Sequence, residues 1–300
     1  MVNGFERARN GLRPACYRGA MAELVRGVSV PAFIYGTAWK EDRTEALTSL
    51  ALAAGFRAID TANQRKHYYE AGVGAAVTRA LRTGMLRRDE LFLQTKFTHV
   101  RGQDDRLPYD PRAPVRIQVD QSFASSLEHL GTDHVDSYLL HGPSTTTGLL
   151  DQDVEAWQAM EAIQQTGRAR QLGISNITLE QLEQLHRLAR VKPRFVQNRC
   201  HASTGWDAQV RAFCRANAIG YQAFSLLTAN RRELTQPLIE EIMLRTGRTR
   251  EQLVFRFAIE LGMIPLTGTS SDQHMRADLD ALAFALDEGD LRGIESIGTR

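Results

Sequence analysis

The chain has 300 residues, of which 43 % are hydrophobic, a formal net charge of +2 and three cysteines. This composition supports a large core, whereas the small net charge and the lack of basic clusters interleaved with aromatics argue against nucleic-acid binding. No apolar run reaches the ~20 residues needed to span a bilayer. Cys16, Cys200 and Cys214 have no metal-ligand spacing and are too few for a disulfide framework. We therefore expect a cytoplasmic protein without metal, membrane or nucleic-acid partners.

The first 20 residues contain four arginines and one acidic residue, but no apolar core typical of a secretory signal. We interpret residues 1–20 as a flexible tail or a misassigned start before Met21, in preference to a transit peptide. The folded domain is accordingly expected at residues 21–300.

Short apolar runs rich in β-branched and aromatic residues recur from residue 32 onward. Each run is too short for a helix and is typical of a strand buried on both faces. In chain order the predicted strands are 32–37, 56–60, 91–96, 135–141, 170–176, 194–198, 219–225 and 263–268.

Segments with helical periodicity lie between these runs, among them 43–55, 115–131, 178–190 and 249–262. Eight strands that alternate with helices, without a Pro/Gly/Ser-rich linker, predict one closed (β/α)8 barrel, the TIM-barrel fold, as a single domain. A doubly wound sheet would need a Gly-rich phosphate-binding turn after its first strand. No such turn follows residues 32–37, so the barrel is favoured.

Two connections are longer than usual, 98–114 after the third strand and 226–236 after the seventh. Both follow the carboxyl end of a strand, which is the end where barrel enzymes carry their active sites. We interpret both as candidate pocket walls, and a plain surface loop is the alternative for each.

Three consecutive predicted strands end on reactive side chains, Asp60, Lys96 and His141. Lys96 is one of only four lysines in a chain with 33 arginines, so lysine is not the usual cation here. A buried lysine paired with an aspartate stays cationic, and a cation beside a phenol lowers the pKa of the phenol. A tyrosine so placed could give a proton to a carbonyl oxygen while hydride arrives at carbon, and a histidine could orient that oxygen.

Seven stretches occur in a fixed order, "GTAW", "GFRAIDTA", "ELFLQTK", "VDSYLLHGP", "LGISN", "FVQNRCH" and "YQAFS". With them the chain resembles an aldo-keto reductase from about Met21 to the C-terminus. The resemblance implies a monomeric barrel that binds NADPH across its mouth and reduces small-molecule aldehydes or ketones to alcohols. It also implies a catalytic tetrad of Asp, Tyr, Lys and His, of which Asp60, Lys96 and His141 match three. The histidine favours carbonyl reduction over reduction of carbon–carbon double bonds.

The resemblance also implies a cofactor site. Three positions match the residues that bind the nicotinamide carboxamide, and Phe224 matches an aromatic residue that stacks on the nicotinamide ring. Trp39 is a candidate substrate-pocket residue, as is His141. The remaining cofactor positions follow from the same match, so that the set comprises Gly36, Thr37, Asp60, Ser175, Asn176, Gln197, Phe224, Ser225 and Leu226.

The loop after Asp60 departs from the family pattern, which has tyrosine five residues after the aspartate and three before a glutamate. Here Arg65 lies five residues after Asp60, and Glu70 follows ten residues on, so the loop is two residues longer. Counting back three residues from Glu70 gives His67, and Tyr68 comes next.

Three outcomes are open for the fourth member of the tetrad. Tyr68 takes the role, His67 acts as the acid instead, or the tetrad is broken and the protein binds cofactor without efficient turnover. We favour Tyr68, because only a phenol makes full use of the Asp60–Lys96 pair and an imidazolium would be repelled by Lys96. Tyr69 is the least favoured of the three neighbours.

The second departure is in residues 266–280, where the family commonly binds the adenosine end and the 2′-phosphate. The family's lysine position is Gly268, its hydroxyl is Thr269, its arginine position is His274 and its asparagine position is Asp278. Two positive charges are missing and a negative one is added, although Arg276 could substitute. NADPH therefore stays the favoured cofactor on family grounds, with NADH possible.

The leading hypothesis is an NAD(P)H-dependent oxidoreductase that converts an aldehyde or ketone to an alcohol with a tyrosine proton donor. The alternative is a cofactor-binding regulatory protein on the same barrel, with little or no turnover because the tyrosine loop is altered. An isomerase or aldolase that uses Lys96 as a Schiff-base former ranks last, since it leaves Ser175, Asn176 and Gln197 unexplained.

Overall fold

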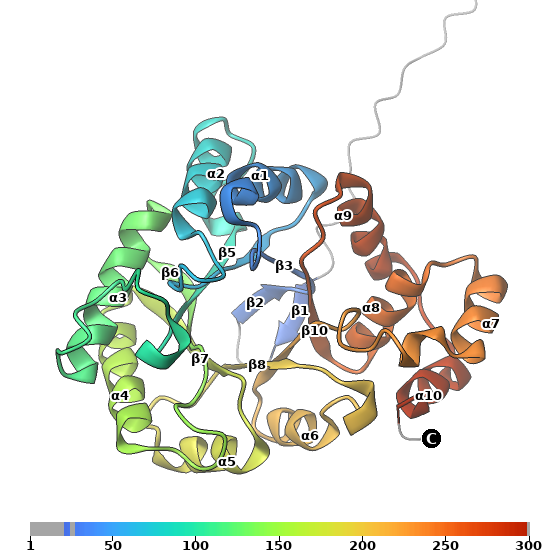
Figure 1. Cartoon of the computed structure of the whole chain (residues 1–300). Helices are drawn as coiled ribbons and strands as arrows, with labels where there is room; N and C mark the ends of the chain where they lie inside the picture. Colours follow the sequence, from blue (N-terminus) through green and yellow to red (C-terminus); the bar gives the residue numbers. More distant parts are fainter. Residues whose placement is uncertain (1–20, 25–27, 299–300) are drawn as a thin grey trace, which may run out of the picture.

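A computed structural model describes residues 21–24 and 28–298 and contains the predicted closed barrel of eight parallel strands (Figure 1). All eight strands overlap the runs predicted from sequence, and the barrel prediction is confirmed. Around the barrel the strands follow chain order, and the last one, β10, pairs with the first, β3. Their bounds are β3 (Ile34–Gly36), β4 (Ala58–Asp60), β5 (Phe92–Phe97), β6 (Val135–Leu140), β7 (Ala169–Ser175), β8 (Phe195–Arg199), β9 (Gly220–Phe224) and β10 (Met263–Thr267).

Helices surround the barrel on its outer side (Figure 1). The four predicted helices correspond to α1, α3, α5 and α8. In α5 and α8 a threonine before the first turn accepts a backbone hydrogen bond, which fixes the helix start. The α-helices are α1 (Thr44–Ala54), α2 (Glu70–Arg82), α3 (Val115–Leu130), α4 (Asp151–Gln165), α5 (Leu179–Leu188), α6 (Ala208–Ala216), α7 (Pro237–Thr246), α8 (Arg250–Glu260), α9 (Asp272–Leu279) and α10 (Glu288–Ser296).

Short 3-10 helices interrupt the connections. Two of them lie in the long loops noted in the sequence, η4 (Val100–Gly102) and η6 (Glu233–Thr235). The others are η2 (Glu41–Arg43), η3 (Arg88–Glu90), η5 (Ala202–Thr204) and η7 (Asp280–Ala283). In the part of the chain that the structure describes, every helix is too short or too polar to cross a membrane.

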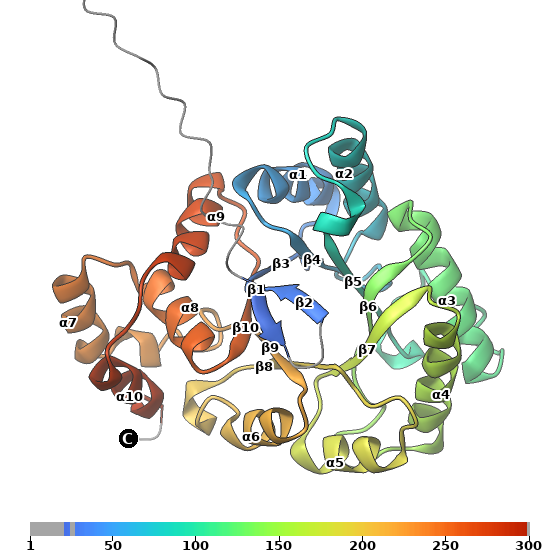
Figure 2. The ribbon, with the colours of Figure 1, turned by 180° about the vertical axis from the view of Figure 1, so that it is seen from behind.

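An antiparallel hairpin of β1 (Met21–Leu24) and β2 (Val28–Pro31) precedes the barrel, and the sequence analysis did not anticipate it. The hairpin lies across one end of the barrel, in front of the strands in Figure 2 and behind them in Figure 1. It leads directly into β3, so it covers the end where the strands begin. The predicted tail, residues 1–20, is outside the described residues.

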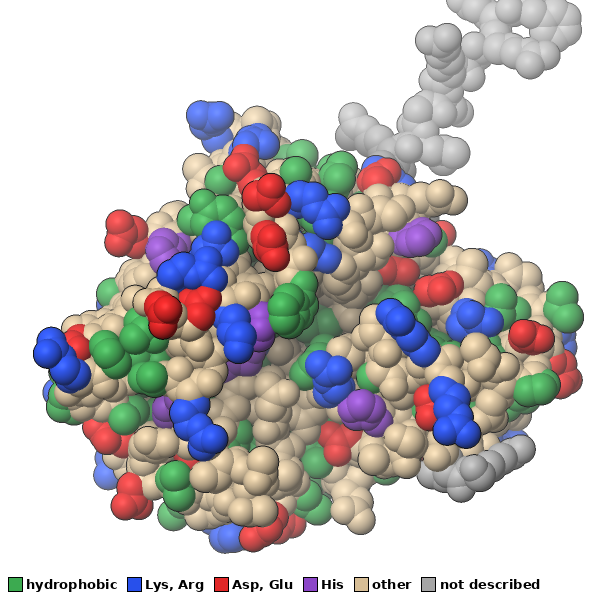
Figure 3. Space-filling model, viewed as in Figure 1, with side chains coloured by type: hydrophobic (Ala, Val, Ile, Leu, Met, Phe, Trp, Pro, Cys, Tyr) green, Lys and Arg blue, Asp and Glu red, His purple; other side chains and the backbone are tan. Residues whose placement is uncertain are grey.

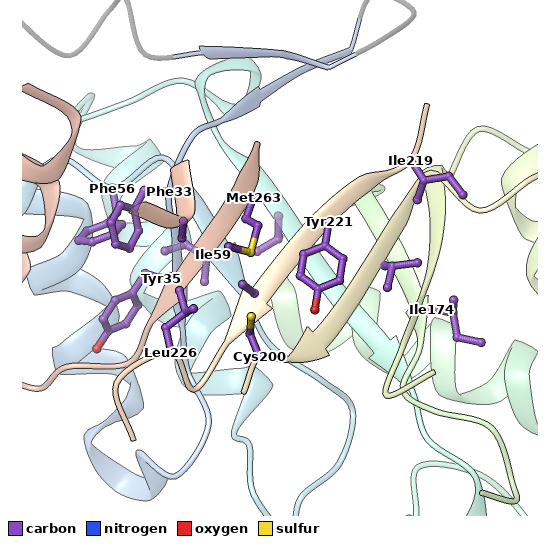
Figure 4. Close-up of a cluster of buried hydrophobic side chains, with 14 of the residues drawn as sticks. Phe33, Tyr35, Phe56, Ile59, Ile174, Cys200, Ile219, Tyr221, Leu226 and Met263 are labelled. Atoms are coloured by element: carbon purple, nitrogen blue, oxygen red, sulfur yellow. The ribbon is translucent and has the colours of Figure 1, made fainter. Parts of the chain in front are cut away.

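The apolar core has two parts because alternate strand residues face opposite sides of the barrel wall. The larger part lies between the wall and the helices and includes Phe33, Tyr35 and Phe56, which Figure 4 shows side by side. The smaller part is a separate cluster inside the barrel, with Phe92 among its members; the others are Ile34, Ala58, Phe195, Ile264 and Leu266.

The interior of the barrel becomes polar toward the carboxyl ends of the strands. On β5, the inward positions after Phe92 are Gln94 and Lys96, and on β4 the position after Ala58 is Asp60. These polar side chains are buried all the same. The hairpin and the apolar cluster therefore close one end, and the polar layer lies under the other, open end.

Candidate active site

Asp60 and Lys96 form a buried ion pair at the ends of β4 and β5. The ammonium of Lys96 donates to both carboxylate oxygens of Asp60 at 2.7 Å and to the backbone carbonyl of Thr61 at 2.8 Å. Burial lowers the pKa of Lys96 below its usual value, and the Asp60 carboxylate opposes this shift. Asp60 therefore holds the Lys96 ammonium in place at the carboxyl ends of the strands.

A hydrogen-bonded network of three buried glutamines adjoins the Asp60 carboxylate. Gln94 donates to Asp60 at 2.7 Å, and Gln197 donates to the same oxygen at 3.0 Å. Gln222 connects the two, because its side-chain oxygen accepts from both, at 2.8 and 2.9 Å, and its amide donates back to Gln94. Sequence reasoning included Gln197 but missed Gln94 and Gln222. Their signal was an amide inside a buried strand.

Of the three neighbours His67, Tyr68 and Tyr69, it is Tyr68 that lies beside this ion pair. Its ring centroid is 5.1 Å from the ammonium of Lys96 and 5.8 Å from the ring centroid of His141. The structure thus brings Asp60, Tyr68, Lys96 and His141 together.

The sequence-based expectation of a lowered phenol pKa is wrong. Burial and the Asp60 carboxylate raise the pKa of Tyr68 above its usual value. Tyr68 is accordingly a neutral phenol that still carries its proton.

His67 and Tyr69 point elsewhere. The ring of His67 stacks on Trp39 with centroids 3.9 Å apart, and the indole is 68 % exposed at the rim. Burial and Lys66 lower the pKa of His67. Tyr69 packs under the guanidinium of Arg65, 4.4 Å from its ring centroid.

The two-residue insertion is accommodated as one tight turn after Gln64. The backbone N–H groups of His67 and Tyr68 both donate to the carbonyl of Gln64, at 3.2 and 3.0 Å. Because neighbouring side chains leave such a turn in different directions, Tyr68 reaches inward while His67 stays at the rim. The longer loop therefore still presents a tyrosine to the ion pair.

His141 follows the end of β6 and is held on several sides. Its backbone N–H donates to Phe97 at 2.8 Å, and its carbonyl accepts from the amide of Asn176 at 2.8 Å. Its Nδ1 is 2.6 Å from the hydroxyl of Thr98. Burial and the charge of Lys96 hold the pKa of His141 well below its usual value, so the imidazole is neutral.

The residues expected to bind the nicotinamide carboxamide lie together next to His141. The hydroxyl of Ser175 donates to the carbonyl of Gln197 at 2.7 Å, and the amide of Asn176 reaches the Ser175 hydroxyl at 3.2 Å. Phe224, at the end of β9, is half-buried, and the guanidinium of Arg199 lies 5.5 Å from its ring centroid.

The other predicted cofactor positions differ in their exposure. The hydroxyl of Thr37 donates to the carbonyl of Asp60 at 2.9 Å, and Gly36 adjoins it at the end of β3. Ser225 is half-buried, with a left-handed backbone (φ 58°). The side chain of Leu226 is buried in the outer core, so its backbone is the part that a ligand could reach.

Lys40 is a candidate site residue that the sequence analysis missed. Its ammonium donates to the carbonyl of Gly268 and lies 3.7 Å from where a Cβ on Gly268 would be. Lys40 is only 7 % exposed, and no carboxylate lies within 4 Å of it among the residues described. Burial lowers its pKa. Its signal was the rarity of lysine, together with its place directly after "GTAW".

The expected negative charge of Asp278 does not face the opening. Its carboxylate accepts from the hydroxyl of Thr267 at 2.7 Å, and burial raises its pKa to about 6. Arg276 pairs with Asp272 one helical turn earlier, at 3.1 Å, whereas His274 is exposed. Thr269 accepts from the backbone of Ser271 at 3.3 Å.

The mouth is visible as a hollow at the centre of the face shown in Figure 3, with Lys, Arg and His side chains around it. Beside it, a cavity of about 340 Å³ lies between the Tyr68 loop, α3 and part of the long loop 98–114. Leu107 and Pro108 of that loop line the cavity together with Tyr68 and Tyr69.

Comparison with known proteins agrees with this geometry. A family model described as "Aldo/keto reductase family" matches residues 33–299. A D-galacturonate reductase of Fragaria ananassa is 30 % identical over 83 % of this chain and 80 % of its own length. An NAD/NADP-dependent indole-3-acetaldehyde reductase of Schizosaccharomyces pombe is 28 % identical over 91 % of this chain and 93 % of its own.

Solved structures give the same result. The crystal structure of an aldo/keto reductase from Brucella melitensis superposes with a TM-score of 0.77 at 28 % identity, and covers 92 % of this chain and 98 % of that one. An aldo-keto reductase complexed with NADPH shares the fold, with a TM-score of 0.78 at 24 % identity over 93 % of this chain and 88 % of that one. The chain belongs to the aldo/keto reductase family and is an NAD(P)H-dependent oxidoreductase that acts on carbonyl groups.

Proposed function

We propose that the protein reduces a small-molecule aldehyde or ketone to an alcohol with Tyr68 as the proton donor and His141 as the group that orients the carbonyl. The single observation that carries this proposal is the position of the Tyr68 ring, 5.1 Å from the ammonium of Lys96 and against His141. His67, the other candidate acid, stacks on Trp39 instead.

A bound reduced nicotinamide supplies a hydride, which adds two electrons to the carbonyl carbon. The neutral phenol of Tyr68 gives its proton to the carbonyl oxygen, where negative charge would otherwise develop. The ammonium of Lys96 stabilises the phenolate left behind, and Asp60 keeps Lys96 in place and charged. The neutral imidazole of His141 donates a hydrogen bond to the same oxygen and fixes the direction of the carbonyl.

The donor set at the mouth suits a nicotinamide cofactor. Ser175, Asn176 and Gln197 offer the hydroxyl and amide groups that a carboxamide needs, and the half-buried ring of Phe224 offers a stacking face. Lys40, buried without a carboxylate within 4 Å in the described chain, offers a positive charge to a cofactor phosphate. We favour NADPH, with NADH as a possible second cofactor, because Lys40 replaces one of the charges that the sequence lacks at Gly268.

The regulatory alternative depends on a broken tetrad. Its basis is weak, since Tyr68 approaches Lys96 despite the longer loop.

We further propose a monomer in the cytoplasm. Cys200 and Cys214 are free and buried, which suits a reducing compartment.

The test is consumption of NADPH and NADH with aromatic, aliphatic and sugar aldehydes by the wild type and by Tyr68→Phe, His67→Ala and Tyr69→Phe. We expect Tyr68→Phe to lower kcat by about 10²–10⁴-fold with cofactor binding unchanged, since the general acid is lost. His67→Ala and the matched control Tyr69→Phe should stay within about threefold of wild type. Loss of activity in His67→Ala alone would assign the acid to the imidazole, and cofactor binding without turnover of any carbonyl would support the regulatory alternative.

A further inference from the structure

Thr98 is the first residue after β5, and it contacts the ring nitrogen of His141 that has no role in the proposed reaction, Nδ1. Its hydroxyl is 2.6 Å from Nδ1 of His141, and the threonine is 5 % exposed. The contact links the first residue of the long loop 98–114 to the imidazole. It therefore bears on how His141 presents its other nitrogen, Nε2.

The direction of this hydrogen bond follows from the polar groups around it. Across residues 21–24 and 28–298, the Thr98 hydroxyl has Nδ1 of His141 as its one hydrogen-bond partner. If Nδ1 carried the proton, the Thr98 O–H would be a buried donor without an acceptor, which is an unfavourable arrangement. If the hydroxyl donates to Nδ1, the donor is satisfied and the single proton of the neutral imidazole must be on Nε2.

The loop holds the rest of Thr98 in place. The phenol of Tyr109 donates to the Thr98 carbonyl at 2.7 Å, and the amide of Gln103 approaches the same carbonyl at 3.4 Å. Gly102 leaves room for the threonine methyl, because a Cβ at that position would be 2.6 Å from it. Backbone, methyl and hydroxyl are thus all fixed, and the loop acts on His141 through one side chain.

We propose that Thr98 is a positioning residue that fixes His141 as the Nε2–H tautomer, so that the imidazole donates to the substrate carbonyl. The proposal rests on the function proposed above, in which His141 orients the substrate. A neutral histidine has one ring proton, so the tautomer decides whether Nε2 donates to the substrate or repels it. The long loop thereby affects the reaction by holding Thr98 in position.

The matched variants are Thr98→Ser and Thr98→Ala, which both lose the methyl and differ only in the hydroxyl. The tautomer is read from the ¹⁵N chemical shifts of the labelled imidazole, with His141→Asn to assign the signals. We expect the Nε2–H form in the wild type and in Thr98→Ser, and a mixture of both tautomers in Thr98→Ala. With a carbonyl substrate, kcat should fall roughly tenfold in Thr98→Ala and no more than about threefold in Thr98→Ser, with NADPH affinity unchanged in both.

Two results would overturn the proposal: an Nδ1–H tautomer in the wild type, or a Thr98→Ala protein that keeps both the Nε2–H form and the wild-type kcat. The chemical shifts do not require turnover. If no carbonyl is reduced but Thr98→Ala still loses the Nε2–H form, then the role of Thr98 stands and the proposed function fails. If Thr98→Ala fails to fold, Gly102→Ala provides the same test, because its new methyl should displace Thr98 and give the same tautomer mixture.

Discussion

The ammonium of Lys40 occupies the space beside Gly268, 3.7 Å from where that glycine's side chain would begin. The two residues are 228 positions apart in the chain, and they meet because β3 and β10 are neighbours in the closed barrel. The loop after β3 therefore places a positive charge beside the position where residues 266–280 lack one. We therefore expect Lys40 to contribute to a preference for NADPH over NADH.

Replacing Lys40 by methionine should weaken NADPH binding by roughly 10- to 100-fold and NADH binding by less. A lost charge-assisted hydrogen bond to phosphate costs roughly 1.5–3 kcal/mol, and only NADPH has the additional 2′-phosphate. Dissociation constants from fluorescence titration would measure both cofactors. Lys66→Met, at an exposed lysine of the rim, is the control and should change neither.

A second cation in the same space offers the complementary experiment. Lys40→Met combined with Gly268→Lys should restore much of the NADPH affinity, because the new side chain starts 3.7 Å from the old ammonium position. Equal losses for NADPH and NADH in Lys40→Met would place the charge on a part of the cofactor common to both. No loss for either would remove Lys40 from the site.

The pH dependence of kcat/KM should lack an inflection near 6.5. Burial and Lys96 keep the pKa of His141 well below that value, so the imidazole stays neutral as the pH falls through 6.5. The alkaline side should be set by Lys96, whose pKa is lowered from 10.5, whereas the pKa of Tyr68 is raised from 10.0. We therefore expect kcat/KM to decline as the pH rises, with an alkaline midpoint below 10.5, because Lys96 loses its proton. A pH–rate profile with an acidic limb near 6.5 would contradict this assignment.

Gln94→Leu should destabilise the barrel by about 1–3 kcal/mol. The change removes a donor to Asp60 and leaves the amide of Gln222 without its acceptor in a fully buried layer. Urea unfolding would measure the loss, and Gln158→Leu on the exposed side of α4 is the control. In the double variant with Gln222→Leu the cost should be less than the sum of the two single changes, because both partners are then apolar. Additive costs would mean that the two amides are not coupled.

Much of the fold could be predicted from the sequence, for a physical reason. Parallel barrel strands are buried on both faces, so each appears as a short apolar run, and all eight runs overlap a strand of the barrel. The β1–β2 hairpin was missed. Its strands are four residues each and pair only with each other, so they carry no comparable pattern.

The candidate site was predictable where its residues lie at or next to the last position of a strand, as Asp60 and Lys96 do. Lys40, Gln94 and Gln222 could not be assigned, because their roles depend on which strands and loops become neighbours when the barrel closes. The pKa of Tyr68 was expected in the wrong direction for a similar reason. Sequence indicates a neighbouring charge, but not the degree of burial, which raises the pKa.

Asp278→Asn should stabilise the protein near neutral pH and have little effect near pH 4. The carboxyl of Asp278 has a pKa of about 6 in the folded protein, against 3.8 ordinarily, so the folded state binds the proton more tightly than the unfolded state does. Its contribution to stability is complete below pH 3.8 and is lost as the pH rises through 6. Asparagine can still accept from Thr267 and avoids the buried charge, so the gain above pH 6 should be about 1–3 kcal/mol.

Urea unfolding of the wild type and Asp278→Asn between pH 4 and pH 8 would measure this difference. Asp272→Asn, at a carboxylate that pairs with Arg276 on the surface of α9, is the control and should show no such rise. A gain that is constant across the pH range would mean that the charge of Asp278 is not its cause. A loss at every pH would mean that the carboxylate stabilises the end of β10 through Thr267 in its ionised form.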